Sequence, residues 1–453
     1  MLSECDCCHR KWLGLRLNSQ GLCTTCARDR GQPRKWSAEN GMQPEEVPAC
    51  LQGLSFMEEM LIARCLPCMY VCRLRAGGQY GYRNHVIAFP QDLQRMVDEL
   101  PRRPSDTDVM VVRKPGVNNT HKDFRVRRSR VKAALEWLIA NNPFYAGVTL
   151  RADVLRELPV DGYPDDVAEL DDAEAADQQP EAAGVDEARE VEQLDTVVTG
   201  VNEPADARRE VEKVKHLLQW PERAQQPASE FNTPGLWTMS YPTLFPTGKA
   251  DLSNIGGNGM LKDVLLQDWA EHLLQWKDHR FAKHPRWRYH VFNMVQRRRA
   301  AQTGTVFVNH ADGQADMSLD ELQELLRAGD SAISKRLFHF GAGLRGTPSW
   351  KAARRGELLD MMDTLGLPHF FMTWSAADTQ WNRLQALLMD AAGEESAEVN
   401  DAGRNRRVNE HPALVNAWFV KRTELFMETV GKKGMGIQDE SATLCSHLFL
   451  IFK

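Results

Sequence analysis

The chain has 453 residues, 42% of them hydrophobic and 26% charged, which is enough for roughly two to four domains with sizeable cores. Its formal net charge of −6 excludes a uniformly basic nucleic-acid-binding protein. The charge is unevenly distributed, because residues 163–200 contain thirteen acidic residues and one basic residue, Arg189. Without that segment's net charge of −12, the rest of the chain carries about +6, so we expect mildly basic folded parts.

The sequence does not favour a membrane or secreted protein. No apolar run reaches the roughly 18 residues of a membrane span, and residues 1–12 are polar and cysteine-rich, unlike a signal peptide. Nine of the ten cysteines lie within residues 1–72, which does not resemble a secreted disulfide scaffold. We therefore expect an intracellular protein without a membrane partner.

Residues 1–42 are predicted to form a small zinc-binding head. Cys5 and Cys8 form one Cys-x2-Cys pair, and Cys23 and Cys26 form a second pair after fourteen intervening residues. Two such pairs can direct four thiolates at one tetrahedral zinc ion, which would be structural because no position is left for water. So short a segment buries little apolar surface, so the metal would supply much of its folding free energy.

Two alternatives to this zinc site stay open. Cys7 or His9 could replace Cys8 as a ligand, since both lie beside it in the sequence. The head could also be a reduced, partly disordered tail that binds no metal.

Residues 43–162 are predicted to form an α/β domain. Ser55 can cap a helix with Glu58 and Glu59 in its first turn, and Pro67 ends that helix before a strand at residues 69–74. Further along, residues 91–100 are predicted to be helical and residues 108–112 to form a strand. Cys65 and Cys68 are interpreted as buried structural thiols, because only Cys72 could join them as a ligand.

A basic run opens the predicted amphipathic helix within Phe124–Tyr145. Its cations are Arg125, Arg127, Arg128, Arg130 and Lys132. They could contact phosphates, or they could be the solvated start of a helix, and the sequence leaves both interpretations open.

Residues 163–215 are predicted to be an acidic, disordered linker, because they contain too few apolar residues to form a core.

Residues 216–453 are predicted to form another α/β domain. Gly248 and Lys249 do not belong to a phosphate-binding loop, since the upstream glycine and the following Ser or Thr are missing.

An amphipathic helix is expected at residues 263–276, followed by basic residues interleaved with aromatic residues. Cations can follow the backbone of single-stranded DNA while aromatic rings stack on its bases. The predicted DNA-binding residues are Arg286, Arg288, Arg297, Arg298 and Arg299.

An apolar run from Phe370 to Met372 predicts a buried strand that ends in a polar loop at residues 376–378. After it, we expect a helix at residues 380–392, a charged loop at residues 393–407 and a long amphipathic helix at residues 412–430. Trp418, Phe419, Leu425 and Phe426 are predicted on or near the buried face of the last helix.

Several segments, in this order along the chain, resemble proteins of the Helitron family of rolling-circle transposons. The first group resembles the uncharacterised domain that precedes the Rep region, and it comprises EEMLIAR, GGQYGY, HVIAFPQD, FRVRR and NNPFY. The second group resembles the N-terminal region of the Rep/helicase protein, and it comprises YPTLFPTG, LRGTPSW, LGLPHFFMTWSAADTQW and HPALVNAWFVKRTELF.

The resemblance implies an HUH endonuclease fold that nicks and transfers single-stranded DNA, with a nuclear location. The strand that opens this fold would carry Phe371, Thr373 and Ser375, with Asp378 in the loop after it. In the complete family protein, two histidines flanking a hydrophobic residue hold a divalent cation such as Mg²⁺. Downstream tyrosines are the nucleophiles.

The sequence contains no His-x-His pair, no tyrosine after Tyr289 and no phosphate-binding loop. The apolar tail at residues 436–453 does not resemble the expected histidine-bearing strand and looks like unrelated sequence. We therefore expect an α/β (α+β) multidomain protein whose HUH-like domain is truncated, with no catalytic residues and with DNA binding as its activity.

Two other interpretations remain. The chain could be a stand-alone, zinc-containing module that binds DNA or protein without enzymatic activity. Least favoured is a complete nuclease in which Asp378 and His369 hold a metal.

Overall fold

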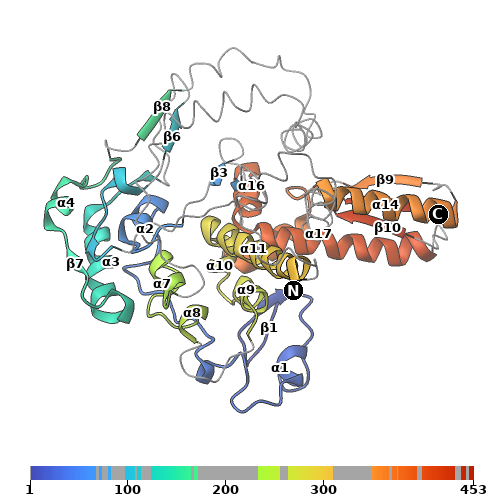
Figure 1. The fold of residues 1–453 in the computed structure, drawn as a ribbon, viewed down its shortest axis with the longest axis horizontal. Helices are drawn as coiled ribbons and strands as arrows, with labels where there is room; N and C mark the ends of the chain where they lie inside the picture. Colours follow the sequence, from blue (N-terminus) through green and yellow to red (C-terminus); the bar gives the residue numbers. More distant parts are fainter. Residues whose placement is uncertain are drawn as a thin grey trace.

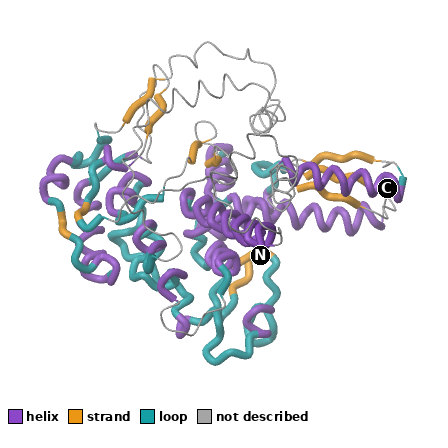
Figure 2. The backbone as a smooth tube through the Cα atoms, in the orientation of Figure 1, coloured by secondary structure: helices purple, strands orange, loops and turns teal. Residues whose placement is uncertain are grey.

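The structure is a computed structural model. The residues it describes are 2–67, 71–73, 80–82, 97–107, 110–113, 124–164, 168–171, 233–255, 264–309, 348–366, 370–374, 376–394, 400–433, 440–444 and 448–452. Helices dominate this part of the chain, and the strands form separate small sheets (Figure 2). The predicted mixture of helices and strands is confirmed. No described helix is both long enough and apolar enough to cross a membrane.

The N-terminal segment contains a short antiparallel hairpin of β1 (Leu2–Glu4) and β2 (Lys11–Leu13). It continues through α1 (Thr24–Arg28) and the 3-10 turn η1 (Ala38–Asn40). Figure 1 shows this segment below the long helix α11, with the N-terminus close to β1.

The next unit is built around α2 (Phe56–Ile62) and α3 (Arg128–Asn141). Ser55 caps α2 as predicted, since its side chain accepts from the Glu58 N–H while the Glu58 carboxylate accepts from the Ser55 N–H. The two helices pack against the parallel pair β5 (Glu99–Leu100) and β7 (Thr149–Leu150) around a shared apolar core. The remaining elements of this unit are the 3-10 turns η2 (Pro104–Thr107) and η4 (Pro143–Tyr145), and α4 (Ala152–Glu157).

One predicted helix of this unit differs from the structure, whereas two predicted strands are present. The helix predicted at residues 91–100 gives way to β5 at its end, and residues 91–96 lie outside the described residues. The predicted strands are present as β3 (Val71–Arg73), paired with β4 (Tyr80–Tyr82), and β6 (Met110–Arg113).

The acidic segment is not structureless throughout. Within it, β8 (Ala168–Asp171) pairs in parallel with β6. A strand obtains its backbone hydrogen bonds from its neighbour and needs no core of its own, which the composition argument did not consider. Residues 172–232 lie outside the described residues.

An aromatic core forms the middle of the molecule. It is built from five helices: α7 (Leu236–Ser240), α8 (Leu252–Ile255), α9 (Leu266–Leu274), α10 (Arg280–Lys283) and α11 (Pro285–Asn309). Trp237, Trp269 and Trp287 are buried together, with ring centroids 5.1–6.4 Å apart. The helix predicted at residues 263–276 is confirmed as α9. α11 contains the basic and aromatic residues from Arg286 to Tyr289 and continues beyond Arg299.

The C-terminal part combines helices with a three-stranded antiparallel sheet of order β10–β11–β9. Figure 1 shows α14 and α17 running alongside this sheet at one end of the molecule. The elements are α14 (Pro348–Leu365), β9 (Phe370–Trp374), α15 (Asn382–Ala392), α16 (Asp401–Glu410), α17 (Pro412–Phe426), the π-helical turn η7 (Met427–Lys432), β10 (Glu440–Leu444) and β11 (Leu448–Phe452).

The strand β9 and the helices α15 and α17 were predicted, but two details differ from the predictions. The expected loop at residues 393–407 is partly helical, because Asn400 caps α16 by accepting from the Gly403 N–H at 2.7 Å. On α17, Leu414, Val415 and Thr423 are buried, whereas Leu425 is 47% exposed and does not lie on the buried face.

The apolar tail is part of the domain in this structure. Residues 448–452 form β11, which lies between β10 and β9 and pairs Phe371 with Ile451. Leu, Phe and Ile in succession have a high strand propensity, so the tail supplies β9 with a neighbour.

Candidate functional site

Four buried cysteine side chains converge at the N-terminal hairpin. The sulfur atoms of Cys5, Cys8, Cys23 and Cys26 all lie within 4.8 Å of one another. Cys5 and Cys8 come from the turn between β1 and β2, and Cys26 lies on α1. This is the set of ligands that the sequence predicted.

The sulfur spacing suits a single tetrahedral ion. The Sγ atoms of Cys8 and Cys23 are 3.8 Å apart, and zinc–sulfur bonds of about 2.3 Å in a tetrahedron place two sulfurs about 3.8 Å apart. The Cys23 backbone N–H donates to the Cys5 sulfur at 3.2 Å, and Arg10 Nε donates to the Cys8 sulfur at 3.4 Å. Such hydrogen bonds stabilise thiolates and orient them around a metal.

The electrostatics of the cluster also favour a cation. A hydrogen bond with Cys26 lowers the pKa of Cys8 to about 4, and the same bond raises the pKa of Cys26. Burial raises the pKa of Cys5. A thiolate therefore forms readily at Cys8, whereas the thiols of Cys5 and Cys26 release their protons more readily when a cation binds beside them.

The structure decides between the candidate ligands. The ring of His9 faces away, with Nδ1 3.1 Å from Glu4 Oε1 and its centroid 5.9 Å from that of Trp276. Cys7 is not part of the cluster, and its carbonyl accepts from Gln43 Nε2 at 2.7 Å. Of the three candidates, Cys8 is therefore the one that belongs to the cluster with Cys5, Cys23 and Cys26.

Gly21 lets the loop between the cysteine pairs close over the site. Its φ is +70°, and a Cβ at this position would lie 1.8 Å from Asp6 Oδ2. Only glycine fits such a close approach in a left-handed conformation.

The predicted DNA-binding arginines all lie on α11 but differ in exposure. Arg286 is only 5% exposed, and its guanidinium lies 5.5 Å from the Phe56 ring centroid and 5.8 Å from that of Tyr241. Arg286 thus packs between two units of the molecule. The side chain of Arg297 lies outside the described residues.

The other arginines reach the surface of α11. Arg288 is half-buried, with its guanidinium 5.7 Å from the Tyr289 ring centroid, Arg298 is half-buried, and Arg299 is exposed beside Gln267. Phe292, which the sequence analysis did not single out, is 47% exposed. Positions 288, 292 and 299 fall within about 40° of one another around a helix of 3.6 residues per turn.

Residues 269–439 match the family described as the Helitron helicase-like domain at the N-terminus. This part of the chain is a Helitron helicase-like N-terminal domain. Residues 29–156 match a domain of unknown function, DUF6570. No curated protein and no solved structure matches the chain. The four cysteines precede both matched regions.

Within the Helitron helicase-like domain, the strand motif is only partly described. β9 contains Phe371 and Thr373, whose side chains lie outside the described residues, as does Ser375. Asp378 follows in a turn, where its backbone carbonyl accepts from Gln385 Nε2 at 3.1 Å. His369, its suggested metal partner, also lies outside the described residues.

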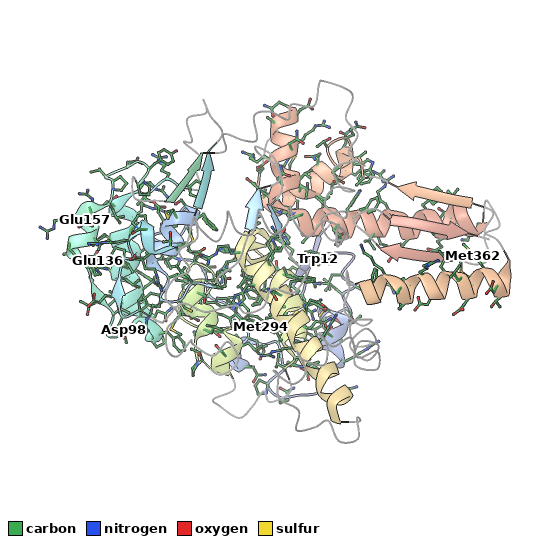
Figure 3. All side chains as sticks on the ribbon, turned by 45° about the horizontal axis from the view of Figure 1, so that its top comes forward. Trp12, Asp98, Glu136, Glu157, Met294 and Met362 are labelled. Carbon is green, nitrogen blue, oxygen red and sulfur yellow. The ribbon has the colours of Figure 1, made fainter. Side chains whose placement is uncertain are left out.

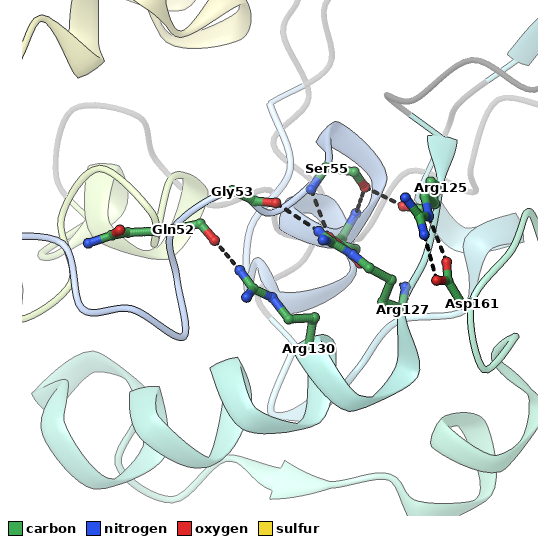
Figure 4. A network of polar contacts seen from close by, with 8 residues as sticks. Gln52, Gly53, Ser55, Arg125, Arg127, Arg130 and Asp161 are labelled. Atoms are coloured by element: carbon green, nitrogen blue, oxygen red, sulfur yellow. Dashed lines mark hydrogen bonds and ion pairs between the residues drawn. The ribbon is translucent and has the colours of Figure 1, made fainter. Parts of the chain in front are cut away.

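In the DUF6570 region, the basic run at the start of α3 makes internal contacts (Figure 4). Arg127 pairs with the buried Glu58 at 2.6 Å, and Arg125 pairs with Asp161 at 2.5 Å. Arg128 and Arg130 donate to the carbonyl oxygens of Leu158 and Gln52. These four arginines therefore make intramolecular contacts at the start of α3.

Buried histidines of the Helitron helicase-like domain were missed by the sequence analysis. His279 on the approach to α10 and His411 before α17 are 1% and 2% exposed, with ring centroids 6.2 Å apart. Burial lowers the pKa of His279 to about 4 and that of His411 to about 3. Their burial depends on contacts 132 residues apart in the sequence, so no local pattern could have shown it.

Proposed function

We propose that this protein derives from a Helitron rolling-circle transposon and binds single-stranded DNA along the exposed side of α11. The observation that carries the proposal is the alignment of Arg288, Phe292 and Arg299 on one side of that helix, within a Helitron helicase-like domain. The arginines would follow the phosphates while the phenylalanine ring stacks on a base. Arg286 is left out because it is buried.

The proposal concerns binding alone. The cleavage chemistry implied by the family resemblance needs a histidine pair for a divalent cation such as Mg²⁺, and this sequence contains no His-x-His. The family resemblance implies a nuclear location, which the position of a fluorescent fusion in cells would test.

Affinity for an unstructured oligothymidine tests the role of α11. We expect Arg288→Gln combined with Arg299→Gln to weaken binding about tenfold or more at low salt. The slope of log Kd against log salt concentration should fall by about 1.4, since each phosphate contact to a single strand contributes about 0.7. Phe292→Ala should weaken binding by about 1–3 kcal/mol without changing the slope, because stacking releases no counterions.

A matched control is available on α14, where Arg354 and Arg355 are both exposed. Arg354→Gln with Arg355→Gln removes the same charge from another helix and should leave affinity nearly unchanged. Equal losses in both double variants would mean that only net charge matters. Wild-type affinity in the α11 variant would overturn the proposal and favour the protein-interaction module.

We also propose that Cys5, Cys8, Cys23 and Cys26 hold a structural zinc ion. Four converging, buried sulfurs with thiolate-stabilising hydrogen bonds support this assignment. Metal analysis of the purified protein should find one zinc per chain, and Cys5→Ser with Cys23→Ser should abolish it. Unchanged zinc content in that variant would refute this site.

A further inference from the structure

The hairpin of β1 and β2 lies between two groups of helices. On one side, the four cysteines belong to the same apolar core as Trp269 and Trp287 of α9 and α11. On the other side, Leu2, Trp12 and Leu13 pack against the core of α15, α16 and α17. Figure 3 shows Trp12 in the densely packed middle of the molecule, away from Met362 on α14.

Arg10 and Lys11, where β2 begins, connect the cysteine cluster with the end of α9 and with α15. Arg10 donates to the sulfurs of Cys8 and Cys23, and its backbone forms a β-bridge with Trp276. The next residue, Lys11, donates its backbone N–H to the Gln275 carbonyl at 2.8 Å, and its ammonium lies 3.8 Å from Asp390 of α15. Two neighbouring residues therefore contact the cysteine cluster, the end of α9 and α15.

This hairpin cannot hold its shape by itself. Each of its strands has three residues, and an isolated two-stranded hairpin is at best marginally stable in water. Cys5 and Cys8 lie in the connection between the strands, so a metal bound there would fix that connection. The backbone bond from the Cys5 N–H to the Arg10 carbonyl, at 3.0 Å, belongs to the same turn.

We propose that metal binding by the four cysteines staples the Helitron helicase-like domain together. The loaded hairpin holds α15–α17 against α9–α11, so the metal site, which precedes the matched region, determines the packing inside it. This inference rests on metal occupancy of the cluster and is independent of DNA binding. Because α10 also contacts α17 directly, loss of the metal loosens the two groups of helices without separating them fully.

Hydrogen exchange on the full chain tests whether metal binding holds α15–α17 against α9–α11. The metal content is measured on the same samples. In Cys5→Ser with Cys23→Ser, zinc is lost and we expect amides of α15–α17 to exchange about tenfold faster or more. α3 serves as the internal reference, because its core does not include the hairpin. Cys7→Ser is the matched control, which should keep both the zinc and the protection.

A second variant separates the staple from the metal itself. Trp12→Ala removes the largest of the three hairpin side chains that pack against the C-terminal helices and leaves all four sulfurs in place. We expect it to retain zinc while α15–α17 lose protection. Unchanged protection of α15–α17 in either variant would overturn the inference, as would an equal loss in α3. Wild-type zinc content in the double cysteine variant would instead refute the metal site.

Discussion

Glu58 shows how one side chain can organise a unit. It is fully buried, and its carboxylate accepts from the Arg127 guanidinium and backbone and from the Ser55 N–H, at 2.6–2.9 Å. One carboxylate therefore caps α2 and neutralises the cation that precedes α3. The sequence predicted the cap from the Ser55–Glu58 spacing, but not the partner, which lies 69 residues away.

We expect Glu58→Ala to destabilise the DUF6570 region by about 3 kcal/mol or more, since it leaves a partly buried arginine without its counterion. The change should appear as faster hydrogen exchange in α2 and α3. Glu136→Ala is a suitable control, because Glu136 pairs with Lys132 at 3.6 Å and both side chains are 56% exposed. Its effect should stay below about 0.5 kcal/mol. Similar effects of the two substitutions would contradict this account.

At the scale of elements, the contact between α10 and α17 depends on two neutral histidines. His279 and His411 are buried, and among the described residues neither ring nitrogen of His279 has a hydrogen-bond partner. Lys283 lies close enough to disfavour a positive charge on both rings. The contact therefore favours the neutral form of both imidazoles.

This contact should weaken as the pH falls. Both pKa values lie below 6.5, at about 4 and about 3, so below pH 6.5 the opened state binds more protons than the closed state. At pH 5 each histidine should cost up to about 2 kcal/mol. We expect hydrogen exchange in α17, corrected for intrinsic rates, to accelerate between pH 7 and pH 5. In His279→Gln with His411→Leu this acceleration should largely vanish; if it persists, other groups cause it.

At the scale of the whole molecule, the units are joined by buried polar contacts as well as apolar ones. Glu59 of α2 is 4% exposed and accepts from His284 Nε2 at 2.6 Å and from Thr243. His284 and the neighbouring charge of Arg286 offset the cost of burying this carboxylate and hold its pKa below the ordinary value. Asn142 donates to the Pro246 carbonyl at 2.7 Å. The DUF6570 region and the aromatic core are thus packed against each other.

The head predicted at residues 1–42 shares the aromatic core, so its removal should affect the remainder. A chain starting at residue 43 would expose the aromatic side chains that Leu22, Trp36 and the cysteines cover. We expect this chain to bind a hydrophobic dye and to lose hydrogen-exchange protection in α9. Native protection in α9 would instead support an independent head, as the sequence boundary at residue 42 implies.

Local patterns in the sequence determined much of this protein. The Cys-x2-Cys spacing identified all four members of the cysteine cluster, the Ser55–Glu58 pair identified a helix start, and an apolar run identified β9. Each of these features depends on residues close together in the chain, or on a chemistry that few residue types can perform. The resemblance carried by longer segments identified the Helitron helicase-like region.

Tertiary structure alone decided which arginines remain accessible, which histidines are buried and what the head packs against. Arg286 and Arg288 are two residues apart on one helix, yet the first is buried and the second is half-buried. The face that a helix buries is set by its neighbours, here elements from α2 to α17, and not by its own composition. For the same reason the sequence could not predict that β11 pairs with β9, because the paired residues lie 74 to 82 positions apart and leave no local signal.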